Sequence, residues 1–425
     1  MALQFKNNIQ QQPSRPNIPA TTIQQLNIPF VSIGTPPGIP SIAVGRTFTP
    51  REPSKLKMPG QDLPRAIDYC ADYGGCGYWR MLFPNMLMNI NQKAAISNLT
   101  QMSLDPRFYE SVKAVRLQRQ ATPIQLKFTQ FLKELGNTHH NYKIIYEIDD
   151  IIFKEDIPDY NRCKVAFDNE EVLKSSIEMM QMSDEISVTC QYMKDYYMDK
   201  TGNKNITVIP NYAPRFWMDK YNPDRIMENY DKNKKKPRVT YIGSGTHFDL
   251  ANKTNQKDDF HHVVDQVIRT RKQFTWVFVG GFPLRCKPFI DSGEMEFIQW
   301  FPLLNLSDAY TTTNVNAVIA PLSDCHFNRA KSNIKYLESA CHGLPGTFQD
   351  METYHMAPLK FNTGDDMISQ LEMLLKDETT YEKYSKMARE YANGMWLDDH
   401  IDEHLELYFT PFGSSERKAL LKNNP

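Results

Sequence analysis

Two stretches of the sequence combine residue types that can hold a phosphorylated ligand. The first is the turn Tyr73–Arg80, in which Gly74 and Gly75 separate an apolar run from a helical stretch. Glycines there let the backbone approach a ligand, and the helix start offers free N–H groups to an anion. Arg80 adds a forked positive charge. The turn matches neither the dinucleotide-binding glycine pattern nor the P-loop, so it disfavours a nicotinamide enzyme and a P-loop ATPase. A plain tight turn is the alternative.

The second stretch, Phe327–Glu338, follows an apolar run and is expected to form one amphipathic helix. At 3.6 residues per turn its polar and apolar side chains sort onto opposite faces, with Lys331, Lys335, Glu338 and His342 on one and Ile334, Leu337 and Cys341 on the other. Two lysines near the helix start suit a diphosphate, and a carboxylate one turn further suits two ribose hydroxyls. The alternative is an ordinary surface helix with a Lys335–Glu338 ion pair.

A third candidate is the pair Asp149 and Asp150, which follows an apolar strand-like run. In parallel sheets the carboxyl ends of the strands border the ligand cleft. Carboxylates at that place can orient or deprotonate an acceptor hydroxyl. A helix cap or turn formed by Asp150 explains the pair equally well.

The composition limits the classes of protein that these residues could serve. The chain has 425 residues, 41% hydrophobic and 23% charged, which is typical of a globular protein of about two domains. A formal charge of -1 provides no general attraction to nucleic acid or anionic membranes. Seven cysteines without a Cys-x-x-Cys pair disfavour a disulfide framework or zinc cluster. With no signal peptide or membrane segment recognised, we expect a cytoplasmic protein.

The elements that must position these residues follow from the apolar pattern. From Arg65 onward, short apolar runs alternate with amphipathic stretches, which predicts parallel sheets with crossover helices. The predicted strands are 66–70, 114–117, 143–148, 185–189 and 206–209, and then 238–242, 275–279, 297–300 and 316–320. We therefore predict an α/β protein with two Rossmann-like, doubly wound domains that face a central cleft.

The predicted domain boundaries lie where composition changes. Residues 1–60 are proline-rich and are expected to form a flexible tail, or an arm that contacts a partner. Residues 65–221 form the first domain, the lysine-rich 222–237 a linker, and 238–395 the second domain. A helix within 396–425 is expected to pack back on the first domain.

Five motifs in this order resemble those of one enzyme family. They are Tyr73–Tyr78, Tyr146–Asp150, Val208–Tyr212, Tyr241–Ser244, and Phe327–Glu338 with Gly343–Pro345. Together they resemble GT-B glycosyltransferases of family 4, over about residues 65–395. The resemblance implies a nucleotide-sugar donor, expected to be a UDP-sugar, bound mainly by the second domain. It also implies retention of the anomeric configuration, with no metal and no further cofactor.

The resemblance also assigns residues. It puts Glu338 on the ribose, as the second acid of the family's Glu-x7-Glu motif, whereas Ala330 replaces the first acid. Asp324 or His326 are candidates to substitute for it, and Gly243–His247 replaces the family's Arg and Lys pair. Asp149 and Asp150 are the predicted catalytic residues. The predicted donor-binding residues are Gly74, Gly75, Arg80, Gly243, Ser244, His247, Arg329, Lys331, Ser332, Lys335 and Glu338.

The sequence thus predicts a retaining, metal-independent glycosyltransferase. The chain looks similar to phage-encoded members, which favours hydroxymethylated pyrimidines in DNA as acceptor, in the cytoplasm of a host cell. Phosphate contacts would come from Arg116, Arg119 and Lys127, with Lys6 and Arg15 of the tail. Alternatives are a polysaccharide or lipid-linked sugar as acceptor, a sugar-nucleotide epimerase, or a catalytically silent nucleotide-binding module. The sequence does not indicate an oligomeric state.

Overall fold

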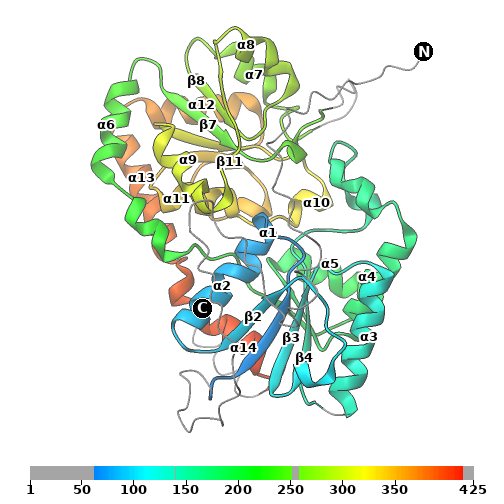
Figure 1. The fold of residues 1–425 in the computed structure, drawn as a ribbon. Coiled ribbons are helices and arrows are strands. Elements are labelled where there is room, and N and C mark those ends of the chain that lie inside the picture. The colour runs from blue at the N-terminus through cyan, green and yellow to red at the C-terminus, as the bar shows by residue number, and fades with distance from the viewer. Residues whose placement is uncertain (1–61, 139, 251–257, 415–425) are drawn as a thin grey trace, which may run out of the picture. The chain divides into compact units, whose positions relative to one another are not determined.

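The computed structural model describes residues 62–138, 140–250 and 258–414, so the predicted tail lies outside the described residues. Within these ranges the strands form two six-stranded parallel sheets (Figure 1). This confirms the predicted α/β fold with two doubly wound sheets. No helix in the described ranges is both long enough and apolar enough to cross a membrane.

The first sheet has the strand order β2-β1-β3-β4-β5-β6. Its strands are β1 (Arg65–Tyr69), β2 (Ala95–Leu99), β3 (Val112–Gln118), β4 (Lys143–Glu147), β5 (Glu185–Val188) and β6 (Ile206–Val208). Because β2 and β3 lie on opposite sides of β1, the chain changes direction between β1 and β3. Ligands of doubly wound sheets bind at such switch points, beside the carboxyl ends of the strands.

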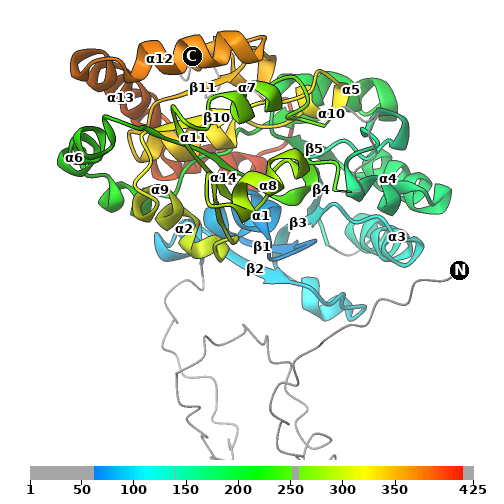
Figure 2. The same cartoon turned by 90° about the horizontal axis from the view of Figure 1, so that it is seen from above.

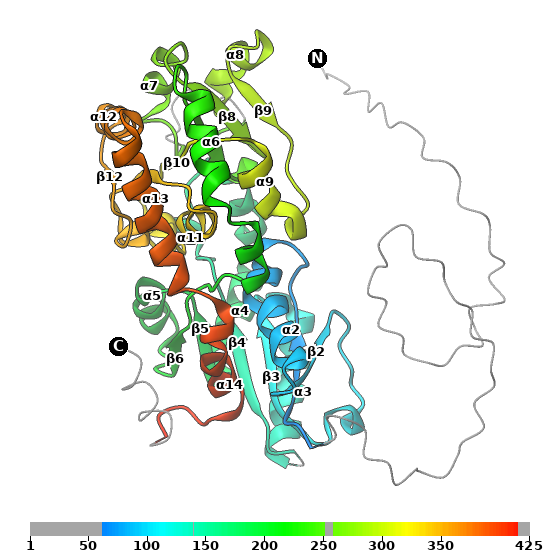
Figure 3. The ribbon, with the colours of Figure 1, turned by 90° about the vertical axis from the view of Figure 1, so that its left-hand side faces the viewer.

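Helices cover both faces of the first sheet, and alternate residues of each strand supply the two apolar layers. Val115 and Ile144 belong to a cluster with Phe128 of α3, whereas Ala114 and Ile145 belong to one with Phe83 of α2. Figure 3 shows α2 and α14 beside these strands, and α14 adds Leu407 to the second cluster. The helices are α1 (Gly75–Gly77), α2 (Phe83–Ile90), α3 (Pro123–Thr138), α4 (Glu170–Met182), α5 (Gln191–Thr201) and α14 (Ile401–Phe409), with a π-helical turn at Tyr78–Leu82.

The second sheet has the order β12-β11-β10-β7-β8-β9, with its switch point between β7 and β10. Its strands are β7 (Arg238–Ile242), β8 (Thr275–Val279), β9 (Glu296–Ile298), β10 (Ala317–Ala320), β11 (Gly346–Gln349) and β12 (Lys360–Phe361). Its helices, visible from above in Figure 2, are α6 (Pro223–Asn233), α7 (Val264–Arg269), α8 (Lys287–Asp291), α9 (Leu306–Thr312), α10 (His326–Arg329), α11 (Ile334–Cys341), α12 (Gly364–Leu375) and α13 (Glu378–Asn393).

Short 3-10 turns join these elements. They cover Pro106–Tyr109, Lys154–Asp156, Arg162–Phe167, Arg215–Lys220, Gly245–His247, Leu284–Cys286, Leu303–Asn305, Glu352–Tyr354 and Leu397–Asp399. The chain passes between the sheets twice, and the two passes pair through a parallel bridge between Ala213 and Trp396. The backbone N–H of Ala213 donates to Met395 and that of Leu397 donates to Ala213.

The structure differs from the sequence prediction mainly in short elements. All nine predicted strands are present, and each predicted end lies within two residues of the observed one. The strands β2, β11 and β12, which are polar or very short, were not predicted. The predicted linker contains α6, which begins where the Asn222 side chain accepts a hydrogen bond from the N–H of Arg225. Ile226 and Tyr230 of α6 are buried in the core around the second sheet, so this segment is a packed helix.

Candidate functional site

The switch point of the second sheet holds a lysine against the end of β7. Lys335 Nζ donates to the carbonyl oxygen of Ile242 at 2.8 Å and lies 4.7 Å from the centre of the Tyr241 ring. A Cβ atom on Gly243 would lie 2.6 Å from this nitrogen and 2.4 Å from the Tyr241 hydroxyl. The glycine therefore lets the ammonium group reach the strand end.

Glu338 lies one helical turn after Lys335 and is 5% exposed. The Tyr310 hydroxyl donates to its Oε2 at 2.9 Å. Burial raises the pKa of Glu338 to about 7, and burial lowers the pKa of Lys335 to about 8. The predicted pair is thus a buried acid and a half-buried base at the switch point, where the protonation of each depends on the charge of the other.

The predicted helix over 327–338 is wrong, because the chain forms two helices. α10 ends at Arg329 and α11 begins at Ile334. Lys331 lies in the break, with its Nζ 3.9 Å from Asp150 and 4.4 Å from the centre of the Phe327 ring. The predicted polar face is also wrong, since α11 is buried from Tyr336 to Cys341 against α13 and neighbouring elements.

The break places its residues against the part of the chain around the first sheet. Ala330 is 1% exposed and joins the first apolar cluster of that sheet with Phe327, and its carbonyl oxygen accepts from the Cys190 thiol at 3.5 Å. Ser332 Oγ accepts a hydrogen bond from Asn211 at 2.9 Å. A carboxylate at position 330 would be buried among apolar side chains, which explains physically why alanine stands there.

Asp324 and His326, the two candidates for the missing acid, and the predicted Arg329 are exposed at the surface. Arg329 Nε donates to Asp324 at 2.6 Å, and both side chains are about half exposed or more. His326 contacts the Tyr192 hydroxyl through its Nδ1. Arg329 and Asp324 line a pocket of about 620 Å³ with residues of α5 and of the segment after β11. They do not join Lys335 and Glu338.

His247 ends the 3-10 turn after β7, which the Ser244 hydroxyl caps by accepting from the N–H of Thr246. Its Nδ1 lies 2.7 Å from Oδ2 of Asp259, which is 1% exposed. Burial and the nearby Lys335 lower the pKa of His247 to about 4. The imidazole is therefore neutral at pH 7, with Nδ1–H donating to the carboxylate.

Asp259 was not predicted and is the centre of this network. Its Oδ1 accepts from the Tyr160 hydroxyl at 2.6 Å, from the Asn328 amide at 2.6 Å and from the N–H of Ser323 at 2.9 Å. Although burial opposes ionisation, the hydrogen bond from His247 and those from its other partners hold the pKa of Asp259 below its ordinary value. No local sequence signal marks it, because its partners are distant in sequence.

The glycine-rich turn after β1 is organised by Asp72, whose Oδ1 accepts from the N–H groups of Gly74 and Gly77 at 2.7 and 3.1 Å. A Cβ on Gly77 would lie 1.9 Å from the backbone oxygen of Asp72, whereas one on Gly75 would meet nothing within 4 Å. The turn itself thus requires Gly77, and the space beside Gly75 is open.

Arg80 does not take the predicted donor-binding place. It is 1% exposed, and its guanidinium donates to Glu147 and to the carbonyl oxygen of Ile209, each at 2.6 Å. Arg116 is fully buried and binds the other oxygen of Glu147. Although burial opposes ionisation, the two guanidinium groups hold the pKa of Glu147 below its ordinary value. Arg80 and Arg116 are engaged in the core, so neither can meet a phosphate.

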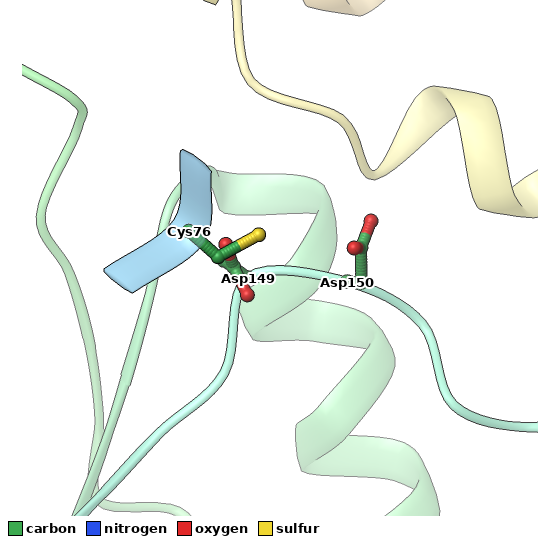
Figure 4. A group of neighbouring side chains, drawn as sticks. All are labelled: Cys76, Asp149 and Asp150. Carbon is green, nitrogen blue, oxygen red and sulfur yellow. The ribbon is translucent and has the colours of Figure 1, made fainter. Parts of the chain in front are cut away.

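Asp149 and Asp150 lie beyond the end of β4, beside Cys76 (Figure 4). One ligand atom of each lies within 4.8 Å of those of the other two, a spacing that a cation could use. The positive charge there comes mainly from Arg119, 3.6 Å from Asp149 and 3.5 Å from Asp150, and Lys331 adds a second cation beside Asp150. Burial raises the pKa of Asp149, and the guanidinium opposes that shift. A divalent cation would therefore compete with Arg119 for both carboxylates.

Arg119 has a backbone φ of 44°, a left-handed conformation that costs free energy in a residue other than glycine. Its Nη2 donates to Asp72 Oδ2 at 2.6 Å. Arg119 thereby joins the loops after β1, β3 and β4 at the switch point of the first sheet. From the sequence, Arg119 was expected on an acceptor phosphate, and this role was not predicted.

Comparison with known proteins supports the fold. No protein-family model matches the sequence, and no curated protein matches it significantly. Among solved structures, Alr3699/HepE from Anabaena in complex with UDP-glucose is similar with a TM-score of 0.53 at 10% identity, covering 81% of this chain and 99% of that chain. A glycosyltransferase from Rickettsia africae ESF-5 is similar with a TM-score of 0.53 at 10% identity, covering 83% of this chain and 100% of the other. At such low identity the likeness concerns the fold, and the two parallel sheets of this chain have the GT-B fold.

Proposed function

We propose that this protein is a glycosyltransferase that moves a sugar from a UDP-sugar to a hydroxyl group. The observation that carries the proposal is the pair formed by half-buried Lys335 and buried Glu338 at the switch point of the second sheet. Doubly wound sheets bind their ligands at this place. In a structure of the same fold, HepE binds UDP-glucose.

The donor roles follow from chemistry and position. Glu338 would accept hydrogen bonds from the ribose hydroxyls. Lys335, Lys331 and Ser332 would hold the diphosphate together with the free N–H groups at the start of α11, where no side chain caps the helix. Lysines and a helix start can stabilise a departing diphosphate without a metal. Gly243, Ser244 and Gly75, which were predicted to bind the donor, would contact it through backbone groups.

Asp149 and Asp150 are the proposed catalytic residues on the acceptor side. The raised pKa of Asp149 makes this carboxylate a better base than an exposed one. Arg119 would orient it and balance the charge of Asp150. Retention of the anomeric configuration remains part of the proposal, on the family resemblance of the motifs.

The charges around the site favour an uncharged, polyhydroxylated acceptor over DNA. Five arginine and lysine residues were expected on DNA phosphates, of which Lys6 and Arg15 lie outside the described residues. Of the other three, Arg116 is buried, Arg119 is paired and Lys127 is exposed. The pocket of about 620 Å³ near Arg329 is lined by one cation, Arg329 itself, and by four carboxylates, those of Asp195, Asp324, Asp350 and Glu352. Such a surface repels phosphates and offers acceptors to hydroxyl donors. Hydroxymethylated DNA is therefore the alternative that the assay must test.

A catalytically silent nucleotide-binding module is the second candidate function. The observation that favours it is Ala330, which is buried where the resembling family has its first acid. This module would bind UDP-sugars and would not release UDP from them.

The test incubates the protein with a panel of nucleotide-sugars and measures release of nucleoside diphosphate, with and without oligosaccharides. A Glu228→Gln variant, altered on an exposed helix surface, is the control for Glu338→Gln. UDP release that Glu338→Gln lowers and Glu228→Gln leaves unchanged supports the proposal. Binding without release supports the silent module, and absence of both contradicts the proposal.

The acceptor is tested by transfer of radiolabelled sugar to oligosaccharides, to hydroxymethylcytosine duplex and to unmodified duplex. Labelling of the modified duplex alone would overturn the preference for an uncharged acceptor. NMR of the product measures the anomeric configuration, and inversion would refute the retaining mechanism.

A further inference from the structure

His247 is the one histidine in the described residues whose ring is tied to a fully buried carboxylate beside the proposed diphosphate site. Its Nδ1 is engaged by Asp259, whereas Nε2 forms no hydrogen bond with any described residue. The side chain keeps 11% of its surface exposed. Its ring centre lies 6.2 Å from that of Tyr241, whose face carries Lys335. Nε2 of the His247–Asp259 pair is therefore available to a ligand near Lys335.

Charged groups face His247 from each neighbouring element. Asp259 attracts a proton to the ring, and it is itself held by Tyr160, Asn328 and Ser323. Lys335 and Lys331 oppose protonation. The remaining titratable groups nearby are Tyr241 of β7, Asp249 on the same loop and Asp258 beside Asp259. The two lysines and the burial of the ring keep the free imidazole neutral.

We propose that binding of the donor diphosphate places a proton from solvent on Nε2 of His247, so that the ring becomes a third cation beside the diphosphate. This inference rests on the proposed function. It assigns to His247 and Asp259 the positive charge for which the sequence has no arginine after β7. His247 contacts the donor through this proton, and Asp259 is a positioning residue that acts through His247.

The physical reason is the change in charge when the donor binds. A bound diphosphate adds negative charge next to Lys335 and Lys331 and so cancels the field that opposes protonation of the ring. Asp259 is already ionised and aligned with Nδ1–H, so the imidazolium meets a preformed partner. By linkage, a donor that raises the affinity of His247 for a proton must bind more tightly when that proton is present.

The expected result is a donor affinity that falls as the pH rises. In the free protein burial lowers the pKa of His247 to about 4. Between this value and the higher pKa of the complex, the Kd for UDP-glucose should rise by up to about tenfold per pH unit. UDP-glucose is the suitable probe because its diphosphate is doubly substituted and does not titrate in this range.

The experiment measures UDP-glucose binding by isothermal calorimetry from about pH 5 to about pH 8, in pairs of buffers with different ionisation enthalpies. The difference in heat between buffers gives the protons taken up per donor bound. Wild type should take up a proton in the acidic part of the range. His247→Gln should bind with no uptake from this group and a flatter pH profile. His355→Gln, altered at an exposed histidine near β11, should match wild type.

Two further variants separate this role from a structural one. Asp259→Asn should reduce proton uptake while UDP-glucose still binds, and its melting temperature reports whether the network survives. Glu338 and Lys335 also titrate near this range, and Glu338→Gln, which removes one of these two groups, should keep the uptake that His247 provides. Proton uptake unchanged in His247→Gln, or absent in wild type that binds UDP-glucose, overturns the inference. Absence of UDP-glucose binding by wild type at every pH would instead overturn the proposed function.

Discussion

Replacement of Glu338 by glutamine should weaken donor use in a way that depends on pH. The substitution keeps the side-chain volume and the oxygen that accepts from Tyr310, and it removes the negative charge. Hydrogen bonds to charged groups contribute about 1.5 to 3 kcal/mol, so loss of the ribose contact should weaken donor affinity by roughly tenfold to a hundredfold. Because burial raises the pKa of Glu338 to about 7, the full difference from wild type is expected only at higher pH.

The pH dependence of folding stability gives a second test of Glu338. The folded protein holds a proton on Glu338 up to about pH 7, whereas the ordinary pKa of this group is 4.5. This carboxyl group therefore favours the folded state below pH 4.5, and that contribution is lost as the pH rises to about 7. Glutamine does not titrate, so Glu338→Gln should not melt earlier than wild type at pH 8.

The assay measures the Kd for UDP-glucose of wild type, Glu338→Gln and Glu228→Gln at about pH 6 and about pH 8.5. The ratio between Glu338→Gln and wild type should be small at the lower pH and largest at the higher one. Equal affinity of the three proteins at the higher pH would remove Glu338 from the donor site. A loss of affinity together with a lower melting temperature would show a damaged fold instead.

Three other perturbations test a buried ion pair, the glycine beside Lys335 and the N-terminal tail. Glu147→Gln should lower the free energy of unfolding in urea by about 3 to 5 kcal/mol, because two buried guanidinium groups lose their counter-charge; a loss like that of exposed Glu390→Gln would contradict this. Gly243→Ala should raise the KM for the donor by roughly tenfold by displacing Lys335, whereas Gly394→Ala, whose Cβ would meet only an oxygen at 3.6 Å, should not. Removal of residues 1–50 should leave the melting temperature nearly unchanged, because this proline-rich stretch has no apolar period; a fall of many degrees would refute that.

The strands that the sequence could predict are the buried apolar ones. Runs such as Thr275–Val279 are apolar on both faces, as central parallel strands must be. β11 was missed because its sequence Gly-Thr-Phe-Gln is half polar. Thr347 and Gln349 are nevertheless buried, because they hydrogen-bond to Gln370 and His262. Partners that distant in sequence leave no local signal.

The site was predictable where chemistry depends on spacing and not where it depends on tertiary partners. The interval from Lys335 to Glu338 is a helical turn in the sequence and in the structure. The break after Ala330 arises from packing against the first sheet, so periodicity could not reveal it. Arg80 was assigned to a ligand because of its forked positive charge after the glycine turn, whereas its burial depends on partners distant in sequence, above all Glu147.

The two switch points present different charged groups, and each set suits one of the two proposed substrates. At the first sheet Arg119 faces three carboxylates, those of Asp72, Asp149 and Asp150, so the excess is negative and suits a hydroxyl donor. At the second sheet Lys331 and Lys335 lie near the partly protonated Glu338, while the charge of Asp259 is taken up by its own hydrogen bonds, so the two lysines suit a diphosphate. Lys331 also lies 3.9 Å from Asp150, which couples the two sets. A diphosphate that draws Lys331 away would leave Arg119 as the partner of Asp150, so the carboxylate oxygen that faced Lys331 could accept a hydrogen bond from an acceptor hydroxyl.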